Sequence, residues 1–215
     1  MKLQHSLLAA ALLAAVSTSA HAQSTGVVTL GGTIVPSTCT VTLSNGGVYN
    51  IGDIDASTLN QATVKDLAFF DQAAEIRCSG PTQFALTAAD NKDGTEANPQ
   101  NFTFGLGQTT TGAKIGHFKL HVVPASVIVD GSAGTMIQST NLSTWATLNP
   151  PWWVQASSAG AARYRAFGSA ASGPVAATTV DFTLQVTPSI NSRNALQLTG
   201  QETMDGSATI TIEYI

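Results

Sequence analysis

Apolar and polar residues alternate along the segment Gly26–Val35. One face of an extended chain would carry Val28, Leu30, Gly32 and Ile34, and the opposite face would carry threonine and glycine. A strand with one apolar face has to bury that face against another layer. Because this segment lies near the N-terminus, where chains usually fray, the pattern predicts an arm that binds another molecule. The pattern alone also allows an ordinary first strand of a closed sandwich.

The same alternation returns at the C-terminal end, in Ser207–Ile215. There Ala208, Ile210, Ile212 and Tyr214 alternate with polar residues, which predicts a strand with one buried face. No residue follows this segment, so we expect no later strand of the same chain beside it. An immunoglobulin-like sandwich would have one more strand at this place.

Short apolar or alternating runs, separated by Gly, Asn, Asp and Pro, fill the rest of the chain. This spacing predicts an all-β sandwich or barrel in one large domain. We also expect a helical turn within residues 56–67. The expected strands are Gly26–Val35, Thr40–Leu43, Val48–Ile51, Ala73–Cys78, Thr82–Ala88, Asn101–Leu106, Gly116–Pro124, Ser126–Val129, Met136–Gln138, Ala161–Phe167, Thr179–Pro188 and Ser207–Ile215.

Residues 1–22 have the composition of an export signal. Lys2 supplies a positive charge, Leu7–Val16 is an apolar core too short to span a bilayer, and Ala20–Ala22 is a small-residue cleavage site. We therefore expect an exported mature chain that begins at Gln23.

Charge and composition exclude several classes of function. The chain has 9 Lys and Arg against 13 Asp and Glu, and loss of Lys2 brings the net charge near −5. Because the sequence has no basic patch, neither nucleic acid nor an anionic membrane is an expected partner. No nucleophile–base pair, metal-ligand motif or phosphate-binding loop is legible, so we expect no enzyme, no metal and no cofactor.

Two cysteines, Cys39 and Cys78, lie in the exported part of the chain. A disulfide between them is the expected state in an oxidising compartment such as a bacterial periplasm. Closing a loop of about 40 residues would stabilise the fold by roughly 4 kcal/mol on the chain-entropy model. The rival interpretation, a pair of metal thiolates, lacks any further cluster of ligands.

Segments near both ends and around the cysteines match the pattern of a known family. They are Val28–Val35, Cys39, Tyr49–Ile54, Cys78 and the penultimate aromatic residue Tyr214. On these residues the chain resembles the pilus subunits (pilins) of the bacterial chaperone–usher pathway. Phe104–Gly107 and Lys114–Leu120 suggest a less studied branch of fimbrial-like proteins.

The resemblance implies an incomplete immunoglobulin-like β-sandwich that lacks its last strand and has one disulfide. It divides the chain into a signal peptide (1–22), an N-terminal donor-strand arm (23–38) and a pilin domain (39–215). The apolar face of the arm would enter a groove beside the apolar face of the last strand, as in chaperone–pilin strand addition. The expected partners are a periplasmic chaperone, an outer-membrane usher and neighbouring subunits of a head-to-tail fimbrium at the cell surface, which supports adhesion.

Three tryptophans, Trp145, Trp152 and Trp153, allow a second interpretation. Exposed aromatic rings stack on sugars, so these residues are candidate glycan contacts of a carbohydrate-binding or tip-proximal adhesin. Tryptophans also anchor long loops to a sandwich, which is the interpretation that we favour.

Two polar groups raise the question of metal binding. Four residues of strand separate His117 and His121 by about 13 Å, which is too far for the two rings to share a metal. We therefore place both residues at the surface or rim. Asp90, Asp93 and Glu96 superficially suggest calcium, but their spacing does not fit an EF-hand loop. We expect a solvated turn there.

Overall fold

The computed structural model describes residues 29–33, 37–156 and 163–215. The chain divides into two units, residues 1–35 and 36–215, which are described separately. In the first unit, residues 29–33 are extended but belong to no strand, and the side chain of Leu30 is 97% exposed. An isolated extended segment has no ladder partner, so the expected strand Gly26–Val35 is not formed in these residues. Val28 and Ile34 lie outside the described residues.

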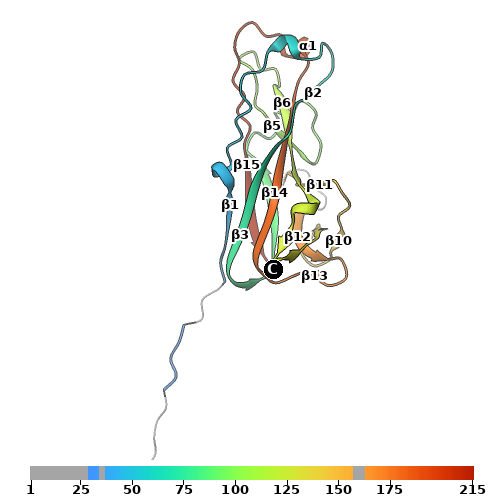
Figure 1. The fold of residues 1–215 in the computed structure, drawn as a ribbon. Helices are drawn as coiled ribbons and strands as arrows, with labels where there is room; N and C mark the ends of the chain where they lie inside the picture. Colours follow the sequence, from blue (N-terminus) through green and yellow to red (C-terminus); the bar gives the residue numbers. More distant parts are fainter. Residues whose placement is uncertain (1–28, 34–36, 157–162) are drawn as a thin grey trace, which may run out of the picture. The chain divides into compact units, whose positions relative to one another are not determined.

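The second unit is a sandwich of two antiparallel sheets (Figure 1). The first sheet has the order β1-β3-β14-β6-β11, with β2, β5, β7 and β8 attached at its sides. Its strands are β1 (Cys39–Leu43), β2 (Lys65–Asp66), β3 (Phe70–Thr82), β5 (Thr103–Gly105), β6 (Gly116–Val122), β7 (Ile128–Val129), β8 (Ser132–Ala133), β11 (Trp152–Trp153) and β14 (Ala177–Ile190).

The second sheet has the order β10-β9-β12-β4-β15, with β13 paired to β12. Its strands are β4 (Phe84–Asp90), β9 (Met136–Ser139), β10 (Ala146–Thr147), β12 (Tyr164–Ser169), β13 (Gly173–Pro174) and β15 (Ala208–Tyr214). The sequence-based expectation of an all-β sandwich is therefore confirmed.

Alternation along the strands builds the core between the sheets. In β14, Val180, Phe182, Leu184 and Val186 are buried, and the intervening polar residues point away from the core. Phe84 and Leu86 of β4 belong to the same buried cluster from the second sheet. The two inner faces thus meet in one hydrophobic layer, as sandwich packing requires.

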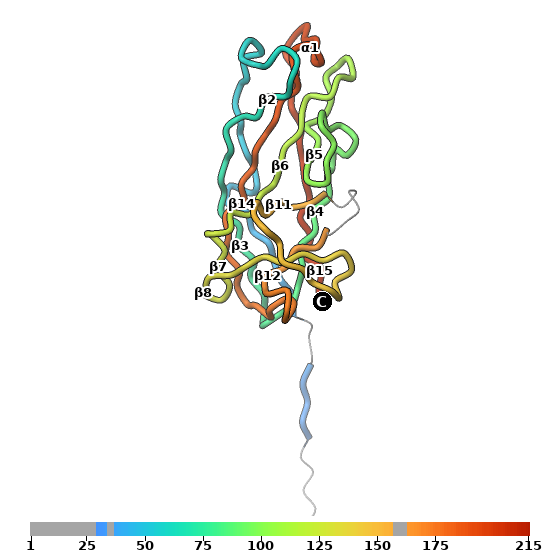
Figure 2. Tube along the Cα trace, turned by 90° about the vertical axis from the view of Figure 1, so that its right-hand side faces the viewer, coloured from blue at the N-terminus to red at the C-terminus, as the bar shows by residue number. Residues whose placement is uncertain are grey.

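Short helical turns connect the strands. They are η1 (Ser44–Gly47), η2 (Ala56–Thr58), η3 (Pro124–Ser126) and α1 (Arg193–Leu196). The Asp55 carboxylate caps η2 by accepting from the Ser57 amide, and this places a helical turn within residues 56–67, as expected. In Figure 2, α1 lies at one end of the second unit and the C-terminus at the other. In the three described ranges, no helix is long and apolar enough to cross a membrane.

The expected disulfide is confirmed. Cys39 and Cys78 face each other in the β1–β3 ladder, and their sulfur atoms are bonded. The bond joins an edge strand to the long strand β3, which in turn pairs with β14 over most of its length. It therefore fixes the edge of the first sheet that borders the candidate site.

Candidate functional site: a groove between two sheet edges

Two edge strands, one from each sheet, come together on one side of the sandwich. Within the described residues, β1 pairs only with β3 and β15 pairs only with β4. The two edges meet at one end, where the Cys39 amide donates a 2.8 Å hydrogen bond to the Tyr214 hydroxyl. Each strand keeps one side without a ladder partner in the described chain, and such an edge can accept a further strand.

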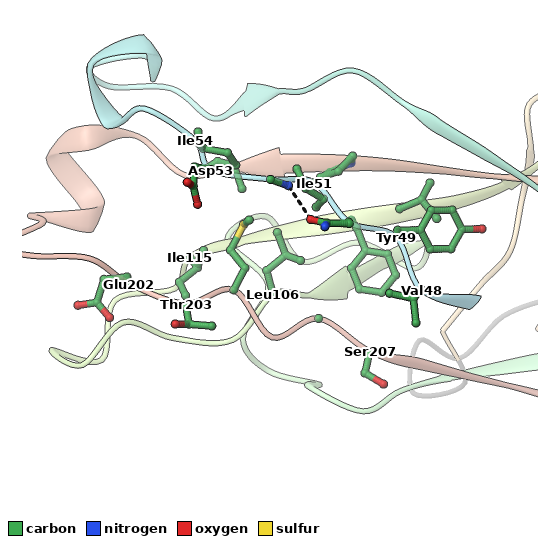
Figure 3. A pocket seen from close by; sticks show the side chains of 18 of the residues that line it. Val48, Tyr49, Ile51, Asp53, Ile54, Leu106, Ile115, Glu202, Thr203 and Ser207 are labelled. Carbon is green, nitrogen blue, oxygen red and sulfur yellow. Dashed lines mark hydrogen bonds between the residues drawn. The ribbon is translucent and has the colours of Figure 1, made fainter. Parts of the chain in front are cut away.

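A groove of about 810 Å³ opens between these two edges. Figure 3 shows Tyr49, Ile51 and Ile54 on one wall, Thr203 and Ser207 on the other, and Leu106 and Ile115 between them. The apolar floor and walls are formed by Leu43, Ile51, Ile54, Leu59, Leu106, Ile115, Phe118, Leu120, Leu184, Val186, Ile190, Leu196, Met204, Ala208 and Ile210.

The first wall is the segment 48–54, which continues from β1 without forming a strand. Two side-chain hydrogen bonds tie it to β3 and β14 of the first sheet. Gln72 Nε2 donates to the Val48 carbonyl at 2.6 Å, and the Tyr49 hydroxyl donates to the Leu184 carbonyl at 3.2 Å. Burial, together with the charge of Asp71, raises the pKa of Tyr49 to about 12, so its hydroxyl keeps its proton and remains a donor.

The second wall is the segment 200–207, which precedes β15 and is also outside any ladder. Glu202 accepts from the Thr110 amide at 3.0 Å and from the Thr110 hydroxyl at 2.7 Å. Asp205 pairs with the Lys92 ammonium, and the Asp205 amide donates to the Leu106 carbonyl at 3.2 Å. Side-chain contacts and isolated backbone bonds, rather than a ladder, therefore fix this wall.

The chemistry of the groove favours an extended apolar segment. The charged side chains among its lining residues are Asp53 and Glu202, and both are acidic. Most of the remaining lining is aliphatic or aromatic, and two walls outside any ladder border it. A chain laid in this groove would gain apolar burial from its inward side chains and main-chain hydrogen bonds from the edges.

The other side of the sandwich is closed by the chain itself. Trp152 pairs with Val122 of β6 in the first sheet, and Ala156 bridges to Ala88 of β4 in the second. The segment between them carries the chain from one sheet to the other, and the Trp152 side chain is buried in the core. The groove therefore lies on the side of the sandwich without such a crossing segment in the described chain.

The predicted face of the last strand lies partly in the groove. Ala208 and Ile210 line it, and Ile212 packs half-buried against the core. Tyr214 is 51% exposed and contributes its hydroxyl to the contact with Cys39 at the end of the groove. Of the arm, Leu30 and Gly32 lie in the described part of the first unit.

Each of the three tryptophans packs into the fold. Trp152 is buried, and its indole N–H donates to the Leu148 carbonyl at 2.8 Å. Trp153 lies between two rings, with Phe102 stacked at 5.5 Å and His121 tilted at 5.1 Å. Trp145 packs with a second small cluster that includes Ile137. This geometry supports the loop-anchoring interpretation over glycan contact.

The expectation that both histidines lie at the surface is wrong for His117. The residue is 2% exposed, because β5 and β14 flank β6 and place Gly105 and Ser189 beside it. Burial, with a contribution from Lys119, lowers the pKa of His117. His121 is half-buried, and burial also lowers its pKa.

The acidic turn is also not simply solvated. One carboxylate oxygen from each of Asp90, Asp93 and Glu96 lies within 4.8 Å of the others, and Glu96 is only 5% exposed. Of these three residues, Asp93 is exposed and Asp90 is half-buried. The turn folds back on itself because the Gly94 amide donates to Glu96 and the Thr95 hydroxyl donates to the Lys92 carbonyl.

Sequence reasoning missed most of the groove lining. Leu196 comes from a short helix that the alternating pattern does not predict. Leu106 ends the expected strand Asn101–Leu106 and directly follows β5, but its place in the groove was not predicted. The second wall, 200–207, is mostly polar in sequence and contributes through its backbone and Met204. Besides the expected face of the last strand, the usable signal was the segment Tyr49–Ile54, in which Tyr49 and Ile51 alternate with the polar Asn50.

Comparison with known proteins gives two similarities. Residues 28–102 match the family described as "Protein of unknown function (DUF1120)". The chain is also similar to protein GltF of Escherichia coli (strain K12), with 27% identity over 250 residues that cover 96% of this chain and 95% of the relative. The family match spans residues 28–38 of the arm, both cysteines and the first wall of the groove.

Proposed function

We propose that the chain is a structural subunit of a chaperone–usher fimbria, which polymerises when the N-terminal arm of one copy fills the groove of the next. The observation that carries this proposal is the apolar groove between two edge strands that lack a second ladder partner within the described chain. A periplasmic chaperone would occupy the groove before assembly, and an outer-membrane usher would receive the complex at the cell surface. No catalytic group is required for such a role.

The arm has the pattern that the groove requires. Val28, Leu30 and Ile34 alternate with polar residues, and Leu30 is almost fully exposed in the free arm. Burying three such side chains would contribute on the order of 5–8 kcal/mol before the cost of ordering the arm is subtracted. The segment 23–35 carries no charged side chain, which suits an apolar groove.

Head-to-tail contact explains why the product would be a filament. The arm and the groove are different surfaces, so each copy offers one of each, and the contact does not close on itself. An unfilled groove would leave an exposed apolar surface and an open edge, both of which promote aggregation. A chaperone is therefore an expected partner of the isolated subunit.

Substitution at two adjacent glycines of the arm tests the proposal. Gly32 lies on the same face as Leu30, and Gly31 lies on the other face. We expect Gly32→Leu to slow polymerisation by about tenfold or more, because overpacking a filled site costs roughly 1–3 kcal/mol. Gly31→Leu is the matched control and should polymerise normally.

The measurement is the rate of polymer formation from the purified chaperone complex, with chaperone binding scored in parallel. Gly32→Leu should leave chaperone binding intact, since the chaperone supplies its own strand. Polymerisation of Gly32→Leu at the rate of the unmodified chain would show that the arm does not enter the groove.

A further inference from the structure

Asp90 links the two sheets beside the groove. It is the last residue of β4, and its ladder partner is Ala208, the first residue of β15. The Asp90 carboxylate also accepts a 2.7 Å hydrogen bond from the Gly105 amide of β5, which belongs to the first sheet. One side chain thus bridges both layers at the level where the second groove wall begins.

Asp90 also faces a second carboxyl group, that of Glu96. One carboxyl oxygen of each lies within 4.8 Å of the other, and the burial of Glu96 disfavours two ionised groups at this distance. This contact closes the turn formed by residues 91–97. Two further bonds then connect the turn to the first sheet: the Gly107 amide donates to the Thr95 hydroxyl at 3.1 Å, and the Ala97 amide donates to the Gly116 carbonyl at 3.1 Å.

The same turn holds the second wall of the groove. Lys92 pairs with Asp205, whose amide is bonded to the Leu106 carbonyl, and the Asn91 amide donates to the Ser207 carbonyl at 3.0 Å. Leu106 and Ser207 both line the groove. A change in the turn would therefore reach the groove directly, without passing through the core.

Other charged groups surround the pair. Asp93 is the third member of the carboxylate cluster and is exposed. Lys114 acts electrostatically on Glu96 and favours its ionised form. His117 of β6 interacts electrostatically with Glu96, Asp66 and Lys119.

We propose that the Asp90–Glu96 contact is a pH-sensitive latch, which holds the 91–97 turn closed against the groove wall in mild acid and releases it above neutral pH. When Asp90 loses its proton, two carboxylates face each other within 4.8 Å and repel. The bonds from the Lys92 and Gly105 amides to Asp90 remain, because a carboxylate accepts them at least as well. The part that opens is thus residues 93–97. This inference does not depend on what occupies the groove.

The protonation behaviour sets the direction of the effect. Burial, and next the hydrogen bond with Glu96, raise the pKa of Asp90 to about 6. For Glu96, burial opposes ionisation, but the bond with Asp90 and backbone amides outweigh it and lower the pKa. A raised carboxyl pKa contributes stability that is present in acid and is lost as the pH rises through about 6.

Amide hydrogen exchange on the full chain, compared at pH 5 and pH 7.5 and corrected for intrinsic rates, tests the latch. We expect the Gly94 and Gly107 amides to lose protection by roughly tenfold at the higher pH, the equivalent of one pKa unit. The Gly105 amide, which is bonded to Asp90 itself, should keep its protection. Equal protection of Gly94 and Gly107 at both pH values would overturn the proposal.

Asp90→Asn is the decisive variant, because its amide can donate to Glu96 as a protonated carboxyl does, although it gives up one of the two bonds that Asp90 accepts from the Lys92 and Gly105 amides. It should show at pH 7.5 the protection that the unmodified chain shows at pH 5. Asp93→Asn removes the same charge from the exposed neighbour and should leave the pH dependence unchanged. If Asp90→Asn fails to fold, carbon-detected titration of the unmodified chain decides: an aspartate titrating near pH 6 supports the latch, and titration of every aspartate near pH 4 refutes it.

Discussion

The Tyr214 hydroxyl accepts a hydrogen bond from the Cys39 amide at 2.8 Å, across 175 residues of sequence. The bond joins the first residue of β1 to the last residue of β15, and so it joins the two sheet edges that border the groove. Cys39 is fixed on its other side by the disulfide to Cys78. One end of the groove is thus closed at Cys39, whose amide makes the hydrogen bond to Tyr214 and whose side chain makes the disulfide to Cys78.

Tyr214→Phe tests this closure. The ring would remain, but the Cys39 amide would lose its acceptor, and we expect a loss of about 1 kcal/mol in the free energy of unfolding. Tyr164→Phe is the control, because its hydroxyl accepts from the neighbouring Arg163, which is exposed. Denaturant titration of both variants measures the difference. Equal midpoints would contradict a role for the Tyr214 hydroxyl.

Gly206→Ala tests the packing of the second groove wall. A Cβ atom at this position would lie 2.6 Å from Leu106 Cδ2, 3.1 Å from Phe118 Cε1 and 3.2 Å from the Gly105 carbonyl oxygen. Because one of these neighbours is backbone, the wall would have to move outward, and we expect a destabilisation of roughly 1–3 kcal/mol.

Gly200→Ala provides the matched control for the packing test. Gly200 lines the same groove, but an added Cβ atom there has nothing within 4 Å. Thermal unfolding should therefore separate the two variants, with Gly200→Ala unchanged. A Gly206→Ala variant as stable as its control would show that the wall accommodates the methyl group without strain.

Replacing both cysteines tests the contribution of the disulfide to the edge of the first sheet. The Cys39–Cys78 bond closes a loop with a sequence separation of 39. Cys39→Ser with Cys78→Ser should lower the free energy of unfolding by roughly 4 kcal/mol on the chain-entropy model. Reduction of the unmodified chain by dithiothreitol is the comparison, and it should reproduce the loss seen in the double variant.

The sequence was informative where alternation is driven by burial. The expected strand Thr179–Pro188 lies inside β14, because its apolar residues face one continuous core. The expected strand Ser207–Ile215 agrees with β15 to within a residue at each end. In contrast, Val48–Ile51 was expected to be a strand and is extended without a ladder. Periodicity reports which face is buried, but it does not report whether a backbone partner is present.

Of the groove, only the face of the last strand was anticipated in residue detail. Ala208 and Ile210 were expected beside it, but the second wall comes from a loop, and the floor combines residues of β6 and β14 with Leu106 and Leu196. Gly206 illustrates the limit. This position has no room for a side chain because Leu106 and Phe118, which are distant in sequence, pack against it. Contacts of this kind depend on the tertiary structure and leave no local pattern.

His117 gives a prediction of pH dependence opposite in sign to that of Asp90. Burial lowers the pKa of His117 below 6.5, and its Nδ1 atom is buried without a hydrogen-bond partner in the described structure. The unfolded chain therefore binds this proton more readily than the folded chain, and stability is lost as the pH falls through 6.5.

We expect His117→Gln to flatten the decline in stability between pH 6.5 and pH 5, because the uncharged amide gains no proton. Denaturant midpoints at half-unit pH intervals measure this slope, and His121→Gln, at a less buried position on the same strand, serves for comparison. A slope that is unchanged in His117→Gln would mean that the buried ring takes up its proton in the folded state as readily as in the unfolded one. In that case water or a rearranged side chain must reach Nδ1, and the interior between β5, β6 and β14 would be more open than the 2% exposure of His117 indicates.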